Sequence, residues 1–485
     1  MKEKKSEAPR RGNEELFKWD GNPTFGQILP LAAQHVLAAV VGCVTPAILV
    51  ANAANNAGGN VNMGLLIQMS LVFAALSTFL QLYGNKIHLG SGLPVIIGVS
   101  FAYVPTMTAI AAQAQDVNTI FGAMIVGGIV AIIVGLTIKQ IRKVFPPLVI
   151  GTVIFAIGLS LYKTAINYMA GNSANTYEVI VEQRGQTAAL VYGSWQNWLV
   201  AFLTLAVVTG LNHFGRGILK LASILIGIIV GYVVSIPFGM VSLSSVGQAK
   251  MFQLPQFMHF GIHFEISACV AIGLLFAINS VQAIGDYSAT TIGAMDREPE
   301  DRELQNGITA YGVTNIIGAL LGGLPTATYS QNVGIVTTTK VINRWVLGLA
   351  AVILGVAGIV PKFSALLTTI PQCVLGGATV SVFASIAMTG MKLVASEEMD
   401  YRNSSIVGLA AAIGVGVSQA SAALASFPEW VTTIFGKSPV VLATLIAVIL
   451  NIILPKSSEE KKHEAKLRKR VKERIRKDHE EFEQH

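Results

Sequence analysis

Charged residues are scarce in this sequence. Only 13% of the 485 residues are Asp, Glu, Lys or Arg, against roughly 25% in soluble domains. Meanwhile 52% of the residues are hydrophobic and the mean hydropathy is +0.59. A soluble protein could not cover its surface with so few charges, so most of the chain must lie in lipid. This composition excludes a cytosolic enzyme, a secreted disulfide scaffold and a disordered regulator.

Cysteine is almost absent, and no cleavable signal peptide is evident. The three cysteines, Cys43, Cys269 and Cys373, all lie in apolar segments, which predicts buried thiols instead of disulfides or a zinc site. The first 29 or so residues are polar, unlike a secretory leader. We therefore expect no cofactor and no metal site.

The positive charge of the chain is concentrated at its two ends. Of the 34 Lys and Arg residues, six lie in residues 1–29 and eleven in residues 456–485. No aromatic residue interrupts the basic run 466–477, so this tail is expected to touch anionic lipid headgroups and not nucleic acid.

The apolar segments predict an all-α polytopic membrane protein with about fourteen spans, each of roughly 20 residues. An even number places both tails on one side, and 29 of the 34 Lys and Arg residues then fall on that side. The positive-inside rule predicts that both termini are cytoplasmic, and we expect the protein to lie in the plasma membrane. The predicted spans are 30–50, 62–83, 94–113, 118–138, 147–166, 195–212, 218–238, 265–285, 307–323, 325–341, 345–361, 364–390, 404–422 and 438–455.

Two pairs of short matches suggest an internal repeat. Gly-Leu-Pro opens the irregular segments at 92 and 323, in the third and tenth spans, and a second echo relates residues 145–151 to 370–376. Seven spans repeated once must be inverted, and broken segments at membrane depth line a substrate site in such folds. The alternative is two proline kinks in ordinary helices. The predicted domains are an N-terminal tail (1–29), a first repeat (30–238), an extracellular connection (239–264), a second repeat (265–455) and a C-terminal tail (456–485).

Polar residues inside the spans are the candidate site. Asn279, Gln282 and Asp286 lie on one helical face of the eighth span. Asp286 is either a proton site or a structural hydrogen-bond acceptor, and His35 in the first span is either structural or part of the site.

The tenth span adds Tyr329 and the amides of Gln331 and Asn332, and the third span adds Phe101 and Tyr103. Amides pair with a flat heterocycle that has an imide edge, and the aromatic rings either stack on it or pack in the core. An inorganic anion would favour an embedded Arg or Lys, and a metal would favour clustered carboxylates.

These motifs resemble the nucleobase–ascorbate transporter family. Gln331-Asn332-Val-Gly334, followed by Thr339, resembles its signature motif, and Gln34-His35 resembles its first-span Gln-His motif. The resemblance implies fourteen spans in core and gate domains, short strands in spans three and ten, homodimers, and elevator-like alternating access around a site between spans one, three, eight and ten. It also implies uptake of xanthine, urate or uracil, with protons or sodium as the coupling ion.

The resemblance also implies roles for individual residues. By the resemblance, substrate would be bound by Gln331, Asn332, Ser100 and Phe101, with Gln282 at the position of the family's glutamate, while Asp286 and His35 would serve coupling. The polar and aromatic pattern adds Tyr103 and Tyr329 to the predicted substrate-binding residues.

Two departures from the family leave alternatives open. Gln282 stands where relatives typically carry Glu, and Tyr311 stands where they tend to carry an acid. The chain is predicted to be a proton-coupled purine transporter. Because an amide cannot titrate, the alternatives are a uracil or other pyrimidine transporter, or an uncoupled or sodium-coupled facilitator. A remoter alternative is an anion transporter of similar fold. A membrane enzyme is not expected, because no nucleophile–base pair or ligand cluster is evident.

Overall fold

The computed structural model describes residues 14–137, 146–171, 191–428, 431–432, 435 and 439–455. The predicted basic tail at 456–485 and residues 1–13 of the predicted N-terminal tail lie outside the described residues.

The described chain is built almost entirely of helices. Its first half contains η1 (Glu14–Phe17), α1 (Phe25–Asn56), α2 (Met63–Tyr83), η2 (Gly84–Ile87), β1 (Ile97–Val99), η3 (Phe101–Tyr103), α3 (Val104–Ala114), α4 (Asn118–Leu136), α6 (Pro147–Met169), α8 (Trp195–Phe214), α9 (Ile218–Leu221), α10 (Ser223–Ser235) and α11 (Ser244–Gln248). Its second half contains α12 (Ile266–Met295), α13 (Asp301–Leu321), β2 (Thr326–Thr328), α14 (Ser330–Thr339), α15 (Arg344–Ile359), α16 (Pro361–Thr368), α17 (Gln372–Val394), α18 (Tyr401–Gln419), η5 (Ser421–Leu424) and α20 (Pro439–Ile453).

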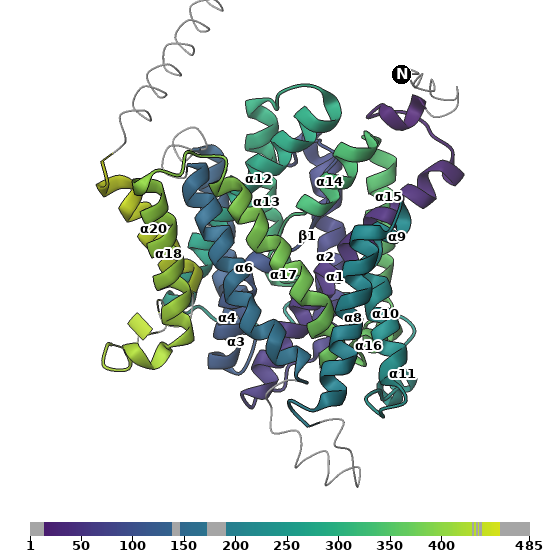
Figure 1. Ribbon diagram of the computed structural model, residues 1–485. Helices are drawn as coiled ribbons and strands as arrows, with labels where there is room; N and C mark the ends of the chain where they lie inside the picture. The colour runs from purple at the N-terminus through teal and green to yellow at the C-terminus, as the bar shows by residue number, and fades with distance from the viewer. Residues whose placement is uncertain are drawn as a thin grey trace, which may run out of the picture.

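These helices pack in two groups (Figure 1). One group joins α1, α2, α3 and α4 to α12, α13, α14 and α15. The other joins α6, α8 and α10 to α17, α18 and α20. Contacts within each group are far more extensive than those between the groups, so each group forms its own packed unit.

Many of the helices are long and apolar enough to cross a membrane. Within the described residues seven single helices meet this condition, and α15 with α16 makes an eighth span if that bent pair counts as one. The chain turns by 78° between α15 and α16, where Pro361 begins the new helix. The prediction of one span over 364–390 is therefore wrong in its boundary. This stretch holds the end of α16 and most of α17, because Pro371 caps a new helix.

The two strands lie at the centre of the first group. They pair antiparallel, with Ile97 opposite Thr328 and Val99 opposite Thr326. Each strand is followed closely by a short helix, α3 or α14, and these two helices leave the strands toward opposite ends of the molecule (Figure 1).

Neighbouring elements satisfy the backbone polar groups that these short strands leave unpaired. Thr78 of α2 accepts a hydrogen bond from the amide of Ile97 and donates one to its carbonyl, both at 3.0 Å. Asn315 of α13 accepts from the amide of Thr326 at 2.9 Å. Non-helical backbone deep inside an apolar bundle is stable only with such partners, so the strands are held from both sides.

A short segment before α1 is fastened to the start of α15. The buried Asn343, the N-cap of α15, places its Nδ2 within hydrogen-bonding distance of three carbonyl oxygens. They belong to Glu15 (3.0 Å), Lys18 (3.1 Å) and Gly21 (2.9 Å). The side chain of Leu16 is buried beside them. We call residues 14–22 with Asn343 the N-terminal latch.

Candidate functional site

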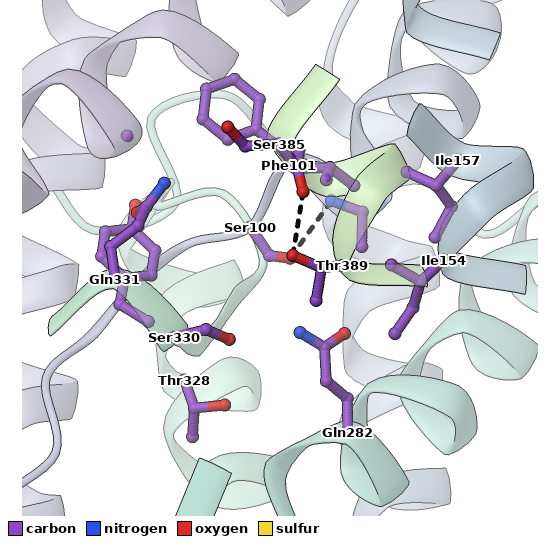
Figure 2. A pocket seen from close by; sticks show the side chains of 14 residues that line it. Ser100, Phe101, Ile154, Ile157, Gln282, Thr328, Ser330, Gln331, Ser385 and Thr389 are labelled. Atoms are coloured by element: carbon purple, nitrogen blue, oxygen red, sulfur yellow. Dashed lines mark hydrogen bonds between the residues drawn. The ribbon is translucent and has the colours of Figure 1, made fainter. Parts of the chain in front are cut away.

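A cavity of about 140 Å³ lies where the two groups of helices meet. One side of it is made by α1, the two strand–helix segments and α12, and the other side by α6 and α17 (Figure 2). Its lining consists of Gly42, Ser100, Phe101, Ala102, Ile154, Ile157, Gln282, Thr328, Tyr329, Ser330, Gln331, Ser385, Ile386 and Thr389. Five of the nine residues predicted from the sequence are in this set: Ser100, Phe101, Gln282, Tyr329 and Gln331.

Two amide side chains line the cavity. Gln282 reaches it from the middle of α12, and Gln331 from the first turn of α14. Neither side chain forms a hydrogen bond within the described part of the chain. Each amide therefore offers its full set of two N–H donors and one carbonyl acceptor to a ligand.

Tyr329 fixes the strand crossing beside the cavity. Its ring lies against Gly42 of α1 and Gly98 of β1, where an added Cβ would come within 2.8 Å and 2.5 Å of ring atoms or the hydroxyl. Its hydroxyl donates to the carbonyl of Val99 at 2.7 Å and lies 3.5 Å from the Sγ of Cys43. Tyr329 therefore locks α1, β1 and β2 together, and only glycines leave room for it.

Asp286 lies behind the cavity wall and not in it. The buried carboxylate accepts hydrogen bonds from the hydroxyls of Thr328 and Ser330, the second at 2.8 Å. Both hydroxyl residues line the cavity. A change at the carboxylate must therefore act on a ligand through these two side chains.

His35 and Asn332 form a separate buried pair. The Nδ2 of Asn332 lies 3.0 Å from Nδ1 of His35 and 3.1 Å from its backbone carbonyl oxygen. The Oδ1 of Asn332 is buried without a partner in the described chain. Neither residue lines the cavity, so the pair connects α1 to α14 one layer behind the site.

Tyr103 also lies outside the cavity. The fully buried ring packs on Phe276, with centroids 5.1 Å apart, and its hydroxyl hydrogen-bonds that of Tyr311. Of the two aromatic residues predicted in the third span, only Phe101 reaches the lining. Phe101 meets Phe383 of α17 edge to face at 5.6 Å, where the two helix groups touch.

The α6–α17 side of the cavity was not predicted from the sequence. That side is built by Ile154 and Ile157 of α6 and by Ser385, Ile386 and Thr389 of α17. The spacing of Ser381, Ser385 and Thr389 every fourth residue was a usable signal, because it marks one polar stripe on an apolar helix.

Ligand clusters for a metal ion are absent from the part of the chain that the structure describes: no three His, Cys, Asp or Glu side chains converge there. The three cysteines are free thiols, and Cys43 and Cys373 are buried. The cavity can therefore act through hydrogen bonds and apolar contact.

Comparison with known proteins gives consistent matches over nearly the whole chain. A sequence model described as the permease family matches residues 26–423. The uric acid permease PucJ of Bacillus subtilis is 32% identical over 429 residues, covering 88% of this chain and 92% of that protein. The xanthine permease XanQ of Escherichia coli K12 is 29% identical over 463 residues, covering 93% and 96%.

A solved structure is similar as well. The transmembrane domain of the cyanobacterial bicarbonate transporter BicA gives a TM-score of 0.54 at 15% identity, covering 88% of this chain and 98% of that domain. At so low an identity, the likeness shows the fold alone.

Proposed function

The chain belongs to the permease family whose sequence model it matches, and we propose that it is a secondary active transporter of nucleobases. Permeases are transporters and not enzymes, and this one is a multi-pass membrane protein. Its preferred substrate is an oxopurine such as xanthine or urate, a choice supported by the names of its relatives. The asymmetry of Lys and Arg supports a plasma-membrane location with both termini cytoplasmic.

The unpaired amides of Gln282 and Gln331 carry this proposal. A base presents alternating N–H and C=O groups along an imide edge, and a side-chain amide pairs with that pattern. A cavity of about 150 Å³ can hold a benzene-sized molecule, so about 140 Å³ accommodates one ring beside Phe101. The second ring of a purine then extends toward the open side of the cavity.

Asp286 is the proposed coupling group. The carboxylate accepts two hydroxyl hydrogen bonds; once protonated, it gains an O–H donor and loses its negative charge, which weakens both of these hydrogen bonds. Since Thr328 and Ser330 line the cavity, protonation changes what the substrate meets. Sodium as the coupling ion, or no coupling at all, remains the alternative because Gln282 and Tyr311 replace acids.

The division into two helix groups supports transport by alternating access. The cavity lies between them, with one wall from each group. Sliding of the first group (the core) against the second (the gate) would therefore move one wall of the cavity past the other. The proposal includes fourteen spans in two inverted repeats and an elevator-like motion. The antiparallel pairing of β1 and β2 is compatible with such a repeat. We also expect a homodimer.

An anion transporter is the second candidate. The first turn of α14 and the start of η3 both border the cavity, and helix N-termini favour anions. The fold similarity to a bicarbonate transporter is compatible with this candidate. Against it, none of the lining residues of the described cavity is Lys or Arg.

Uptake into proteoliposomes tests these alternatives. We expect labelled xanthine to accumulate above equilibrium when a proton gradient is imposed, and labelled bicarbonate not to enter. Equilibration without accumulation would mean an uncoupled facilitator. Entry of bicarbonate but of no base would favour the anion transporter and contradict this proposal.

Leucine substitutions at Gln282 and Gln331 test the site. Each removes hydrogen bonds worth about 0.5–1.5 kcal/mol apiece, so xanthine affinity should fall roughly tenfold or more for each variant. Gln419→Leu, an exposed change at the end of α18, is the matched control and should leave uptake unchanged.

A further inference from the structure

The α17 side of the cavity has a different hydrogen-bonding character from the amide side. Its polar side chains are Ser385 and Thr389, which stand one turn apart on α17. The remaining side chains on this side of the cavity are those of Ile154, Ile157 and Ile386. In Figure 2, the amide of Gln282 points from α12 toward Thr389. A ligand in the cavity therefore meets two chemically distinct walls.

The hydroxyl protons of Ser385 and Thr389 both form hydrogen bonds within helix α17. Ser385 donates to the carbonyl of Ser381 at 3.0 Å, and Thr389 donates to the carbonyl of Ser385 at 2.9 Å. A hydroxyl in this state keeps lone pairs but has no free proton. While these internal hydrogen bonds are kept, this wall offers acceptors only, whereas Gln282 and Gln331 offer donors as well.

The two walls set a requirement on the ligand. A carbonyl oxygen turned toward α17 would face acceptor lone pairs and isoleucine methyl groups, with no donor to replace water. A ring N–H turned the same way finds an acceptor in Thr389 or Ser385. The favoured ligand thus carries an imide edge for the amides and a further N–H on another edge.

We infer that Thr389, supported by Ser385, is a specificity-determining residue that accepts a hydrogen bond from a ring N–H of the substrate on an edge that the glutamine amides do not hold. This inference rests on the proposed nucleobase transport. An oxopurine meets this requirement, because its imidazole ring supplies an N–H away from the six-membered imide edge. Methylation of that imidazole nitrogen removes the donor.

Competition for labelled xanthine uptake by xanthines methylated at single ring nitrogens tests the inference in proteoliposomes holding the full chain. Thr389→Val removes the oxygen and keeps the shape of the side chain, while Thr389→Ser keeps the oxygen. Loss of one hydrogen bond should weaken xanthine competition roughly three- to tenfold in Thr389→Val. The variant should also lose most of its discrimination against imidazole-methylated xanthine and keep its discrimination against methylation at the imide nitrogen.

Two controls separate this role from a structural one. Thr389→Ser should retain the competition pattern of the unaltered protein, and the melting temperature of Thr389→Val should stay unchanged, because its side chain is exposed to the cavity. An unchanged methyl-xanthine pattern in Thr389→Val, with or without Ser385→Ala, would overturn the inference while xanthine uptake still supports the proposed function. Absence of base uptake by the unaltered protein would instead overturn the proposed function, and this inference with it.

Discussion

The two strand–helix segments that cross at the centre of the molecule share a backbone plan but differ in chemistry. Both begin with Gly-Leu-Pro and contain a three-residue strand followed by a helix. The first strand reads Ile-Gly-Val and the second Thr-Ala-Thr. After its strand, the first segment places Ser100, Phe101 and Ala102 at the cavity, whereas the second places Tyr329, Ser330 and the amide of Gln331 there.

This difference separates support from recognition. The first segment contributes mostly apolar contact and, at Gly98, the space that Tyr329 of the second segment fills. The second segment contributes the hydroxyls of Thr328 and Ser330 that donate to Asp286. It also contributes the amide of Gln331 at the cavity and the hydrogen bond from Asn332 to His35. Two segments with the same backbone plan therefore serve different roles. Substitutions in the first should mainly lower stability, and substitutions in the second should mainly impair substrate binding or coupling.

The largest expected effect comes from closing the space in the first segment. Gly98→Ala would place a Cβ 2.5 Å from the ring of Tyr329. Overpacking of this kind costs about 1–3 kcal/mol, so we expect a lower melting temperature of the purified protein and at least a tenfold loss of xanthine uptake.

Gly334→Ala in the second segment is the matched control. A Cβ at this position meets nothing within 4 Å, and alanine stabilises a helix interior by about 1 kcal/mol relative to glycine. The melting temperature should therefore stay the same or rise. Equal destabilisation by the two alanines would show that the first segment is not the supporting one.

A smaller effect is expected at the pair behind the cavity. Asn332→Leu leaves the buried Nδ1 of His35 without its hydrogen-bond donor, which costs about 1–3 kcal/mol. Thermal unfolding of Asn332→Leu, His35→Leu and the double variant should give a coupling energy of about 0.5–3 kcal/mol. Strict additivity would mean that the hydrogen bond contributes nothing measurable.

The smallest effects should distinguish the serines of the two segments. Ser330→Ala removes a hydrogen bond to a carboxylate, worth about 1.5–3 kcal/mol, and should lower proton-driven xanthine accumulation several-fold. Within the described residues, the hydroxyl of Ser100 has one hydrogen-bond partner, the amide of Ala102 at 3.2 Å, so Ser100→Ala should change accumulation less than twofold. Accumulation ratios at fixed proton gradient measure both, and the reverse order would remove Asp286 from the coupling scheme.

The sequence motif located the polar segment but could not assign all its side chains. Successive residues on a helix point about 100° apart, so Gln331 and Asn332 cannot both face one small cavity. Gln331 lines it and Asn332 turns back to His35. In the same way, Phe101 reaches the cavity while Tyr103 packs on Phe276.

The α17 side of the cavity could not be predicted from a local sequence pattern. Ser385 and Thr389 lie more than 50 residues from Gln331 and reach the cavity only because α17 packs along α6. That packing depends on close approach at glycines such as Gly158 and Gly390, where a Cβ would meet neighbouring backbone within 2.4 Å and 2.2 Å. Such glycines resemble any others in an apolar span until the partner helix is known.

The N-terminal latch bears on how the protein should be engineered for purification and labelling. A tag joined before residue 14 leaves the contacts of Asn343 intact. Removal of the residues through Gly21 would instead leave the buried side-chain amide of Asn343 without these three carbonyl acceptors and expose the apolar surface that Leu16 covers. Versions of the protein made for imaging or affinity capture should therefore keep Glu14 and all residues after it.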